Sequence, residues 1–359
     1  MSLHTTRIES NQQLWVSRRF PPHVAARTPV TGNQTLSPVQ IVAQTSSETG
    51  FEIIPIAEPL GVNPNDAESS LLVQIGDLVR FGTVLAERKK MFGRSTHVTS
   101  PVEGTVAEIE NGDLFITRTP EDLNLRSLVH GTVSQVIPGK GVVIETFGSR
   151  FQAAWSNGNE GAGNLHVLGE AADEALQIEH LDVDLYGAVA AIGHLDQPNL
   201  LKSLTDAGVA GLIAGTVSPD VFQAITNWHL PFILTDGAGS GGIYPAIYNL
   251  LRENNGNHSA LFGSKYGQTS RPEVVMISEN GLENAEQKPS RREKKPTSLK
   301  VGQKIRLLSG VNRGLEGIIK KTYSWPQTTS TGIKSEGADV EFSTGEVAFV
   351  STTNLDIIM

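Results

Sequence analysis

The sequence predicts a multidomain, mainly β protein that contains one α/β segment with a parallel sheet. Its 359 residues exceed what one hydrophobic core usually organises, so we expect roughly two to four domains. The 36 glycines and 18 prolines, together with 38% hydrophobic residues, are typical of short strands joined by turns. Near residue 166, strand-like alternation changes to alternating strands and helices, which predicts the α/β segment.

Composition divides the chain into five segments. We predict an extended N-terminal arm over residues 1–35, a β-rich region over 36–165, a small α/β domain over 166–279, a basic linker over 280–298 and a C-terminal β domain over 299–359. The arm carries four arginines against one acidic residue, and we expect it to dock on its own protein or on a partner. A partly ordered tail is the alternative. The linker is polar, contains proline and has almost no apolar side chains, as exposed connecting segments do.

The β-rich region contains one pattern twice. Residues 104–109 and 131–136 both begin Gly-Thr-Val, continue as an alternating strand and lead through a glycine turn into a second apolar strand. Each copy predicts a β-hairpin. The two copies indicate either two related β modules or two halves of one compact β domain.

In the α/β segment, strands and helices alternate three times. The expected strands are 187–193, 210–214 and 231–235, each followed by a helix, at 199–207, 221–228 and 243–253, and 258–262 is a further strand. This order predicts right-handed crossovers onto a parallel sheet.

The carboxyl ends of such parallel strands meet at one edge, which is where open sheets bind ligands. The candidates there are Gly193, His194, Thr216, Asp236, Gly237, Gly239, Ser240 and Gly241. The glycine-rich run 236–242 can bring backbone N–H groups and the positive end of a helix close to an anion. It lacks the Lys-Ser/Thr of a Walker A loop, and it follows the third strand rather than opening the unit as a dinucleotide fingerprint does. A βα connection without a ligand is the alternative.

Composition excludes several classes of site. The chain has no cysteine, so thiolate catalysis, iron–sulfur clusters and cysteine zinc sites are excluded. The nine histidines never lie three or four residues apart, and Gly239-Ser240-Gly241 lacks the spacing of a hydrolase elbow. We therefore expect no complete catalytic site, no metal and no cofactor. We expect a cytoplasmic location without membrane insertion, since neither a signal peptide nor an apolar run of about 20 residues is evident.

The C-terminal segment reads LKVGQKIRLLSGVNRGLEGII over residues 299–319. An alternating strand leads into a turn with Gly310, Gly314 and Gly317, and a second strand follows. This pattern resembles the KOW motif of NusG-type transcription factors and some ribosomal proteins. The resemblance implies an SH3-like β-barrel, and barrels of this type bind RNA, proteins or neighbouring domains.

Basic and aromatic residues in and before this domain are candidates for binding a partner. They are Arg291, Arg292, Lys294, Lys295, Arg313, Lys320, Lys321, Tyr323 and Trp325. Bases stack on aromatic rings while cations hold phosphates, so the set is compatible with RNA. Residues 299–359, however, contain seven Lys and Arg against six acids, a weak basic footprint for a nucleic-acid binder.

A second resemblance covers residues 76–106. The segments GDLVRFGTVL (76–85) and SPVEGTV (100–106) resemble the barrel-sandwich hybrid of biotinyl and lipoyl carrier domains. They also resemble equivalent domains in subunits of the Rnf complex and the sodium-pumping NADH:quinone reductase. Carrier domains hold a modified lysine at a hairpin apex, but the apex here falls near Gly93, with Lys89 and Lys90 on the rising strand. We therefore expect a structural sandwich.

These observations predict a non-enzymatic binding or scaffold protein whose C-terminal domain docks on a protein, an RNA or a ribonucleoprotein. The competing class is an accessory protein or enzyme that binds an anion or nucleotide at the α/β segment. The sandwich resemblance would associate that class with a redox complex. The sequence predicts no oligomeric state.

Overall fold

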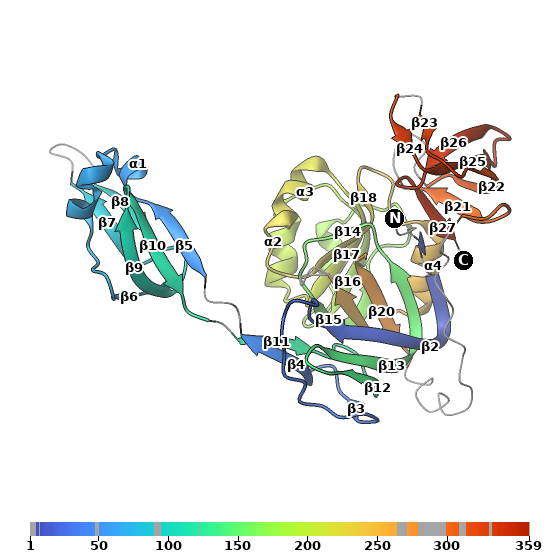
Figure 1. The fold of residues 1–359 in the computed structure, drawn as a ribbon. Helices are drawn as coiled ribbons and strands as arrows, with labels where there is room; N and C mark the ends of the chain where they lie inside the picture. Colours follow the sequence, from blue (N-terminus) through green and yellow to red (C-terminus); the bar gives the residue numbers. More distant parts are fainter. Residues whose placement is uncertain are drawn as a thin grey trace. The chain divides into compact units, whose positions relative to one another are not determined.

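The computed structural model describes residues 5–6, 8–46, 50–89, 95–120, 122–263, 271–278, 299–308, 314–329 and 332–358. The fold is mainly β, with several sheets, one of them a mixed sheet that contains parallel strands (Figure 1). The chain forms two compact units. Unit 2 is Gln44–Asn124, and unit 1 combines Met1–Ala43 with Leu125–Met359, so unit 2 is an insertion in the sequence of unit 1. Within the described residues, no helix has both the length and the apolar character needed to cross a membrane.

Unit 2 is built around a four-stranded antiparallel sheet in the order β5-β10-β9-β6. Its strands are β5 (Phe51–Pro55), β6 (Leu78–Val79), β9 (Gly104–Glu110) and β10 (Asp113–Arg118). The hairpin β7 (Val84–Arg88) and β8 (Thr96–Thr99), the helix α1 (Ala57–Leu60) and the 3-10 helix η1 (Pro64–Ser70) complete the unit. Alternate residues of β10, Leu114 and Ile116, enter the core together with Leu85 of the hairpin, because successive side chains of a strand point to opposite faces.

A two-stranded ribbon marks the passage between the units. It consists of β4 (Ile41–Ser46) and β11 (Asp122–Arg126), which pair with each other. The side chains of Gln44 and Asn124 are hydrogen-bonded across it at 2.9 Å. Both ends of the insertion therefore leave from adjacent strands.

Unit 1 contains an 11-stranded sheet, in which ten strands follow one another in order and the eleventh, β2 (Ile8–Arg19), pairs with β13. In spatial order its strands are β14 (Trp155–Ser156), β18 (Phe232–Ala238), β17 (Gly211–Val217), β16 (Val189–Leu195), β15 (Gly161–Val167), β19 (His258–Phe262), β20 (Glu273–Ile277), β13 (Gly141–Gln152), β12 (Gly131–Ile137) and β3 (Thr35–Leu36). The strands β15 to β18 pair in parallel, and the other pairs are antiparallel. The predicted parallel strands are present, and β15 is an additional one before them.

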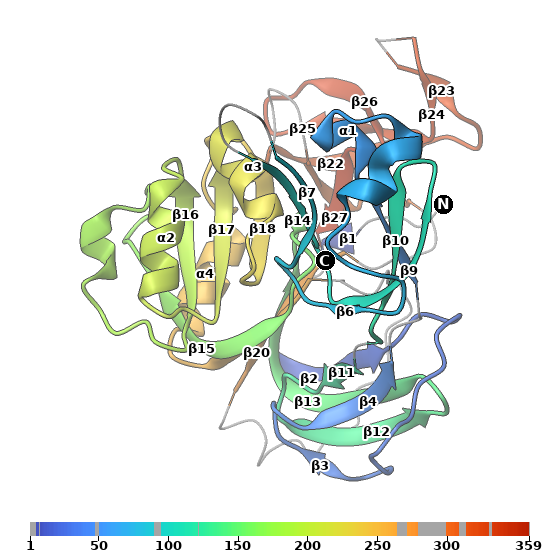
Figure 2. The same ribbon diagram turned by 90° about the vertical axis from the view of Figure 1, so that its left-hand side faces the viewer.

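Helices cover both faces of the parallel strands (Figures 1 and 2). The elements are α2 (Asn199–Asp206), α3 (Pro219–Thr226), α4 (Pro245–Glu253) and the 3-10 helix η2 (Ile178–Leu181). Leucines of α2 and Val221 of α3 pack on one face of the sheet, and Ile247 of α4 packs on the other. The side chain of Ser218 caps α3 and Pro219 opens it, as the sequence predicts for a helix start.

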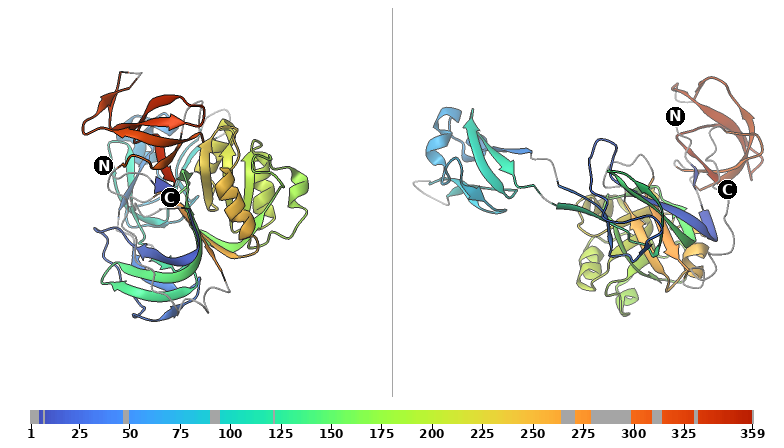
Figure 3. Two further views of the ribbon diagram at one scale, coloured as in Figure 1. Left: turned by 90° about the vertical axis from the view of Figure 1, so that its right-hand side faces the viewer. Right: turned by 60° about the horizontal axis from the view of Figure 1, so that its bottom comes forward.

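A separate six-stranded sheet, which we call the C-terminal sheet, has the order β1-β27-β21-β22-β25-β26. Figure 3 draws the strands from the C-terminal part of the chain in red. Its strands are β1 (Thr5–Thr6), β21 (Lys304–Leu307), β22 (Glu316–Thr322), β25 (Gly337–Phe342), β26 (Val347–Ser351) and β27 (Leu355–Ile358). Between β22 and β25 in the sequence, β23 (Gln327–Thr328) and β24 (Lys334–Ser335) pair as a separate two-stranded ribbon. Ile305, Ile319, Val340 and Leu355 form its core.

Part of the N-terminal segment predicted as an extended arm pairs with the rest of unit 1. Residues Ile8–Arg19 form β2, which pairs with β13 along its length (Figure 1). Leu14 and Val16 are buried in this strand. Arg18, one of the four arginines of this segment, is buried in an ion pair with Glu160.

The repeated Gly-Thr-Val pattern forms two hairpins, β9–β10 and β12–β13, as predicted. A Cβ on Gly104 would lie 2.2 Å from a carbonyl oxygen of the opposite strand, and one on Gly131 would lie 2.4 Å from the equivalent oxygen. The buried Ser100 and Ser127, four residues before each glycine, both donate a hydrogen bond to a carbonyl two residues ahead. The two copies lie in different units, so they are related modules rather than halves of one compact domain.

Candidate functional site

The predicted ligand residues do gather at the carboxyl edge of the parallel strands. His194 on β16 lies opposite Thr216 on β17, and Thr216 lies opposite Gly237 on β18. Asp236 precedes Gly237 at the end of the same strand. The topology therefore brings together three loops that are far apart in the sequence, as expected for a parallel sheet.

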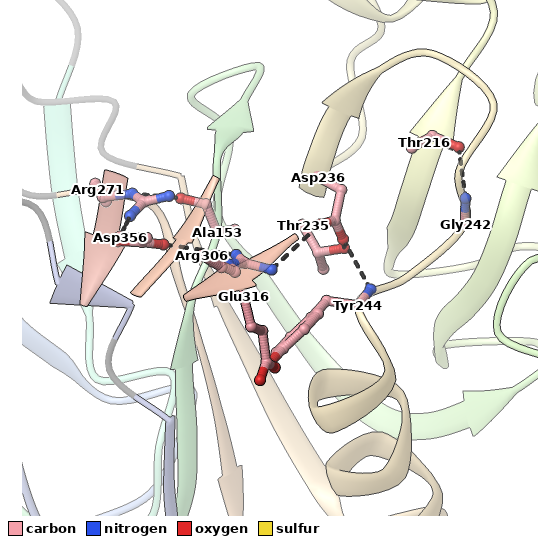
Figure 4. A network of polar contacts seen from close by, with 10 residues as sticks. All are labelled: Ala153, Thr216, Thr235, Asp236, Gly242, Tyr244, Arg271, Arg306, Glu316 and Asp356. Atoms are coloured by element: carbon pink, nitrogen blue, oxygen red, sulfur yellow. Dashed lines mark hydrogen bonds and ion pairs between the residues drawn. The ribbon is translucent and has the colours of Figure 1, made fainter. Parts of the chain in front are cut away.

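The carboxylate of Asp236 is engaged by the protein itself (Figure 4). Its Oδ2 accepts hydrogen bonds from the Thr235 hydroxyl at 2.6 Å and from the Tyr244 backbone N–H at 3.0 Å. Tyr244 is the N-cap of α4, where an external anion would interact with free N–H groups and the helix dipole. The carboxylate of Asp236 therefore occupies the position in which the sequence predicted a bound anion.

Thr216 closes the neighbouring part of the edge. It is fully buried, its Oγ1 accepts a hydrogen bond from the Gly242 N–H at 3.1 Å, and it lies 2.8 Å from His194 Nδ1. The structure thus pairs His194 with Thr216, whereas Asp236 interacts with other partners. The loop Gly239-Ser240-Gly241 is exposed, but Gly242 is held against the sheet.

The chain segment 169–176 covers the same edge. A Cβ on Gly193 would lie 2.6 Å from the Glu174 carbonyl oxygen, and one on Gly242 would lie 2.3 Å from the Ala172 carbonyl oxygen. Backbone hydrogen bonds join His194 to Glu174 and Ile243 to Ala172. In a ligand-binding loop of this kind, such backbone N–H groups would be free to bind the ligand. Here the N–H groups of His194 and Ile243 donate to carbonyl oxygens of the segment 169–176 instead.

An arginine of the C-terminal sheet completes the closure of this edge. Arg306 of β21 donates to Asp236 Oδ1 at 3.2 Å, and its guanidinium lies 4.6 Å from the ring centroid of Tyr244. On its other side Arg306 lies 3.6 Å from Asp356, which also accepts from Arg271 at 2.7 Å. We call these four charged residues and Tyr244 the Arg306 network; both carboxylates of the network face arginines (Figure 4).

The hydroxyl of Tyr244 donates a hydrogen bond to Glu316 at the start of β22. Burial, together with this hydrogen bond, raises the pKa of Tyr244 well above its usual range. The tyrosine is therefore a neutral donor, and no acid–base role follows from its position.

Sequence reasoning missed Arg306, Tyr244, Glu316 and Asp356. The segment Lys304-Ile305-Arg306-Leu307 has the alternation of a strand with a solvent-facing arginine, and nothing local distinguishes Arg306 from Lys304. The structure distinguishes them, since Arg306 is 1% exposed. The sequence of a strand does not show whether a charged residue between two core residues will face solvent or be covered by a second sheet.

Two predicted basic residues of the C-terminal sheet contact neighbouring side chains, Lys320 an acid and Lys321 an aromatic ring. Lys320 lies 2.5 Å from Glu341, and Lys321 Nζ lies 4.8 Å from the ring centroid of Tyr323. The Tyr323 hydroxyl donates to Asp339 at 2.6 Å, which raises the pKa of the tyrosine. The Glu341 carboxylate therefore compensates the charge of Lys320, which an RNA phosphate would need.

Trp325 is the most exposed aromatic residue of this group. Its side chain is 74% exposed, two residues beyond Tyr323. Its carbonyl oxygen accepts from the Gln327 side chain, at the start of the β23–β24 ribbon. The other predicted partner residues, Arg291, Arg292, Lys294, Lys295 and Arg313, lie outside the described residues.

Over the described ranges, no three His, Asp or Glu side chains are placed to share a metal ion. Comparison with known proteins adds no family: no family model and no curated protein matches this sequence.

Proposed function

We propose that this chain is a non-enzymatic scaffold protein whose C-terminal sheet, an SH3-like barrel of the KOW type, docks on a partner protein. The observation that carries the proposal is the outward face of β22, β25 and β26. Ile318 on β22 lies opposite Glu341, which in turn lies opposite Val347, and both apolar residues are exposed. A face that combines exposed apolar side chains with compensated charges is suited to protein contact.

An aromatic anchor stands near this face. Trp325 follows Tyr323, whose ring packs edge-on against Phe349 of β26 at 5.9 Å. Exposed tryptophans are frequent energetic centres of protein interfaces. RNA binding is supported less, because Lys320 and Lys321 already face Glu341 and Tyr323.

The parallel strands and their helices act, in this proposal, as an α/β platform that holds the barrel. The Arg306 network anchors the C-terminal sheet on the end of β18. Because Asp236 and the segment 169–176 fill the carboxyl edge, the anion-binding alternative has no support from the geometry.

Affinity purification of the tagged full chain from its native source, followed by mass spectrometry, identifies the partner. Binding of that purified partner is then measured for the wild type and for Trp325→Ala, with Val301→Ser, an exposed apolar residue before β21, as control. We expect Trp325→Ala to weaken binding by roughly tenfold or more, and the control to leave it unchanged. Oligo(U) RNA is measured in parallel at low and high salt. Salt-sensitive RNA binding that is lost on changing Lys320 and Lys321 to Ala would contradict protein docking.

A further inference from the structure

The four-stranded sheet of unit 2 has two unlike faces. Ile54, Val106, Leu114 and Ile116 point into the core. The alternate residues lie on the opposite face, which we call the outer face. Antiparallel sheets that pack on one side usually carry polar residues on the other.

Here one row of the outer face ends in an exposed apolar side chain on each side, with two threonines between them. Strand pairing places Phe51, Thr117, Thr105 and Leu78 side by side across all four strands. Phe51 is 65% exposed and Leu78 is 68% exposed. At the usual strand spacing, this row extends about 14 Å.

The next row continues the apolar surface and then becomes acidic. Ile53, which is 56% exposed, lies opposite Phe115, and Phe115 lies opposite Glu108. Beyond them, Asp113 pairs with Glu110. Among the described residues of these four strands, the outer-face positions include no Lys or Arg.

Unit 2 as a whole is also negatively charged. Residues 44–124 contain thirteen acidic and six basic residues, and so account for seven of the nine net negative charges of the chain. A field of one sign attracts a surface of the opposite sign and repels nucleic acid and other acidic proteins.

We propose that the outer face of unit 2 is a second docking surface, for a protein whose contact patch has an apolar centre bordered by Lys or Arg. Phe51, Ile53, Phe115 and Leu78 supply the apolar contact, because exposed apolar patches of this kind mark interaction sites. Glu108, Glu110 and Asp113 supply the acidic border. This surface does not involve Trp325, so it goes beyond the function proposed above.

The first test asks whether the outer face is free in the full chain. The protein has no cysteine, so Ile53→Cys introduces a single thiol. We expect it to react with iodoacetamide as fast as the exposed control Val301→Cys. Slow reaction at all protein concentrations would mean that another part of the chain covers the face, and slow reaction only at high concentration would indicate a second copy. Either result overturns the proposal.

The second test uses two synthetic amphipathic helical peptides with the same leucine stripe, one bordered by lysines and one by glutamates. Fluorescence anisotropy with the full chain should show roughly tenfold tighter binding of the lysine peptide, decreasing with salt. The double variant Phe51→Ser/Ile53→Ser should lose roughly tenfold in affinity. Since both residues are exposed, its thermal unfolding should match that of the wild type.

A matched control changes exposed apolar residues of unit 1, Ile178→Ser/Val183→Ser, and should bind the lysine peptide as the wild type does. Trp325→Ala should also leave peptide binding unchanged, which separates this proposal from the C-terminal docking function. Equal affinity for the two peptides, or equal losses in the unit 1 control, would overturn the proposal.

Discussion

Arg306 and Asp356 lie directly opposite each other on β21 and β27, and both side chains are buried on the face that points away from the apolar core of the C-terminal sheet. Their neighbours Ile305, Leu307 and Leu355 fill that core instead. Arg306 also contacts Asp236, so the pair lies where the C-terminal sheet meets the end of β18. Charges alternate along Arg271, Asp356, Arg306 and Asp236.

Replacing Arg306 by Met should destabilise the protein by about 3–5 kcal/mol, because it leaves buried carboxylates without one of their cations. The matched control is Lys304→Met, an exposed residue two positions earlier, 3.9 Å from Glu316. It should cost less than about 1 kcal/mol. Guanidinium chloride unfolding of both variants measures the difference, and equal midpoints would show that the network contributes nothing to stability.

The C-terminal sheet should stay bound after the linker is cut. We expect trypsin to cleave first within residues 288–295, since polar segments with basic residues are preferred sites. The Arg306 network and the parallel pairing of β1 with β27 should then keep the C-terminal fragment associated with the remainder.

Size-exclusion chromatography with mass spectrometry of the peak fractions detects both fragments. Arg306→Ala should release the C-terminal fragment, whereas Lys304→Ala should not. Separate elution of the wild-type fragments would mean that the described contacts are too weak to hold the sheet.

Gly242 and Gly237 both have positive φ, at +70° and +94°, but their surroundings differ. A Cβ on Gly242 would lie 2.3 Å from the Ala172 carbonyl oxygen, whereas a Cβ on Gly237 meets no atom within 4 Å. Gly237→Ala should cost about 1–2 kcal/mol from backbone conformation alone. Gly242→Ala should cost at least twice as much in unfolding free energy, because the covering segment must also move. A smaller loss for Gly242→Ala would show that this segment is loosely held.

Stability should depend on pH through His258. Burial lowers the pKa of His258, and the nearby His130 adds to the lowering. The hydrogen bond between its Nε2 and the Leu128 carbonyl oxygen, at 3.0 Å, acts in the opposite direction but does not outweigh burial. The folded state therefore binds the proton less readily than the unfolded state, so stability should fall as the pH decreases below about 6.5 and level off once His258 is protonated in both states.

Thermal melts from pH 7.5 to 5 for the wild type and His258→Gln check this expectation. The variant should show a smaller decrease toward low pH. His97→Gln, an exposed histidine of β8, is the control and should retain the wild-type profile. Identical pH profiles for all three proteins would rule out His258 as the source.

The helices of the parallel-strand region were predictable because their signals are local. Ser218 and Pro219 start α3, as helix-start signals predict. The helix expected at 243–253 begins at Pro245 in the structure, two residues later. The division into two units was not predictable in the same way. Both Gly-Thr-Val hairpins have the same local pattern, and only the pairing of β13 with the distant β2 and β20 assigns its hairpin to unit 1.

The candidate site shows the same contrast. The rule for parallel sheets correctly brought His194, Thr216 and Asp236 to one edge. It could not show that this edge is filled, because Arg306 arrives from a segment 70 residues later in the chain. Contacts between sheets depend on tertiary packing, and tertiary packing produces no periodic pattern in the sequence.

The β4–β11 ribbon explains how unit 1 accommodates an insertion. The polypeptide leaves unit 1 and returns to it on neighbouring strands, joined at Gln44 and Asn124. The entropic cost of closing a loop grows only with the logarithm of its length. Pairing β4 with β11 therefore costs little more with an insertion between them than with a short turn. Unit 2 is thus inserted at a point where the pairing of β4 with β11 can be kept whatever the length of the chain between the two strands.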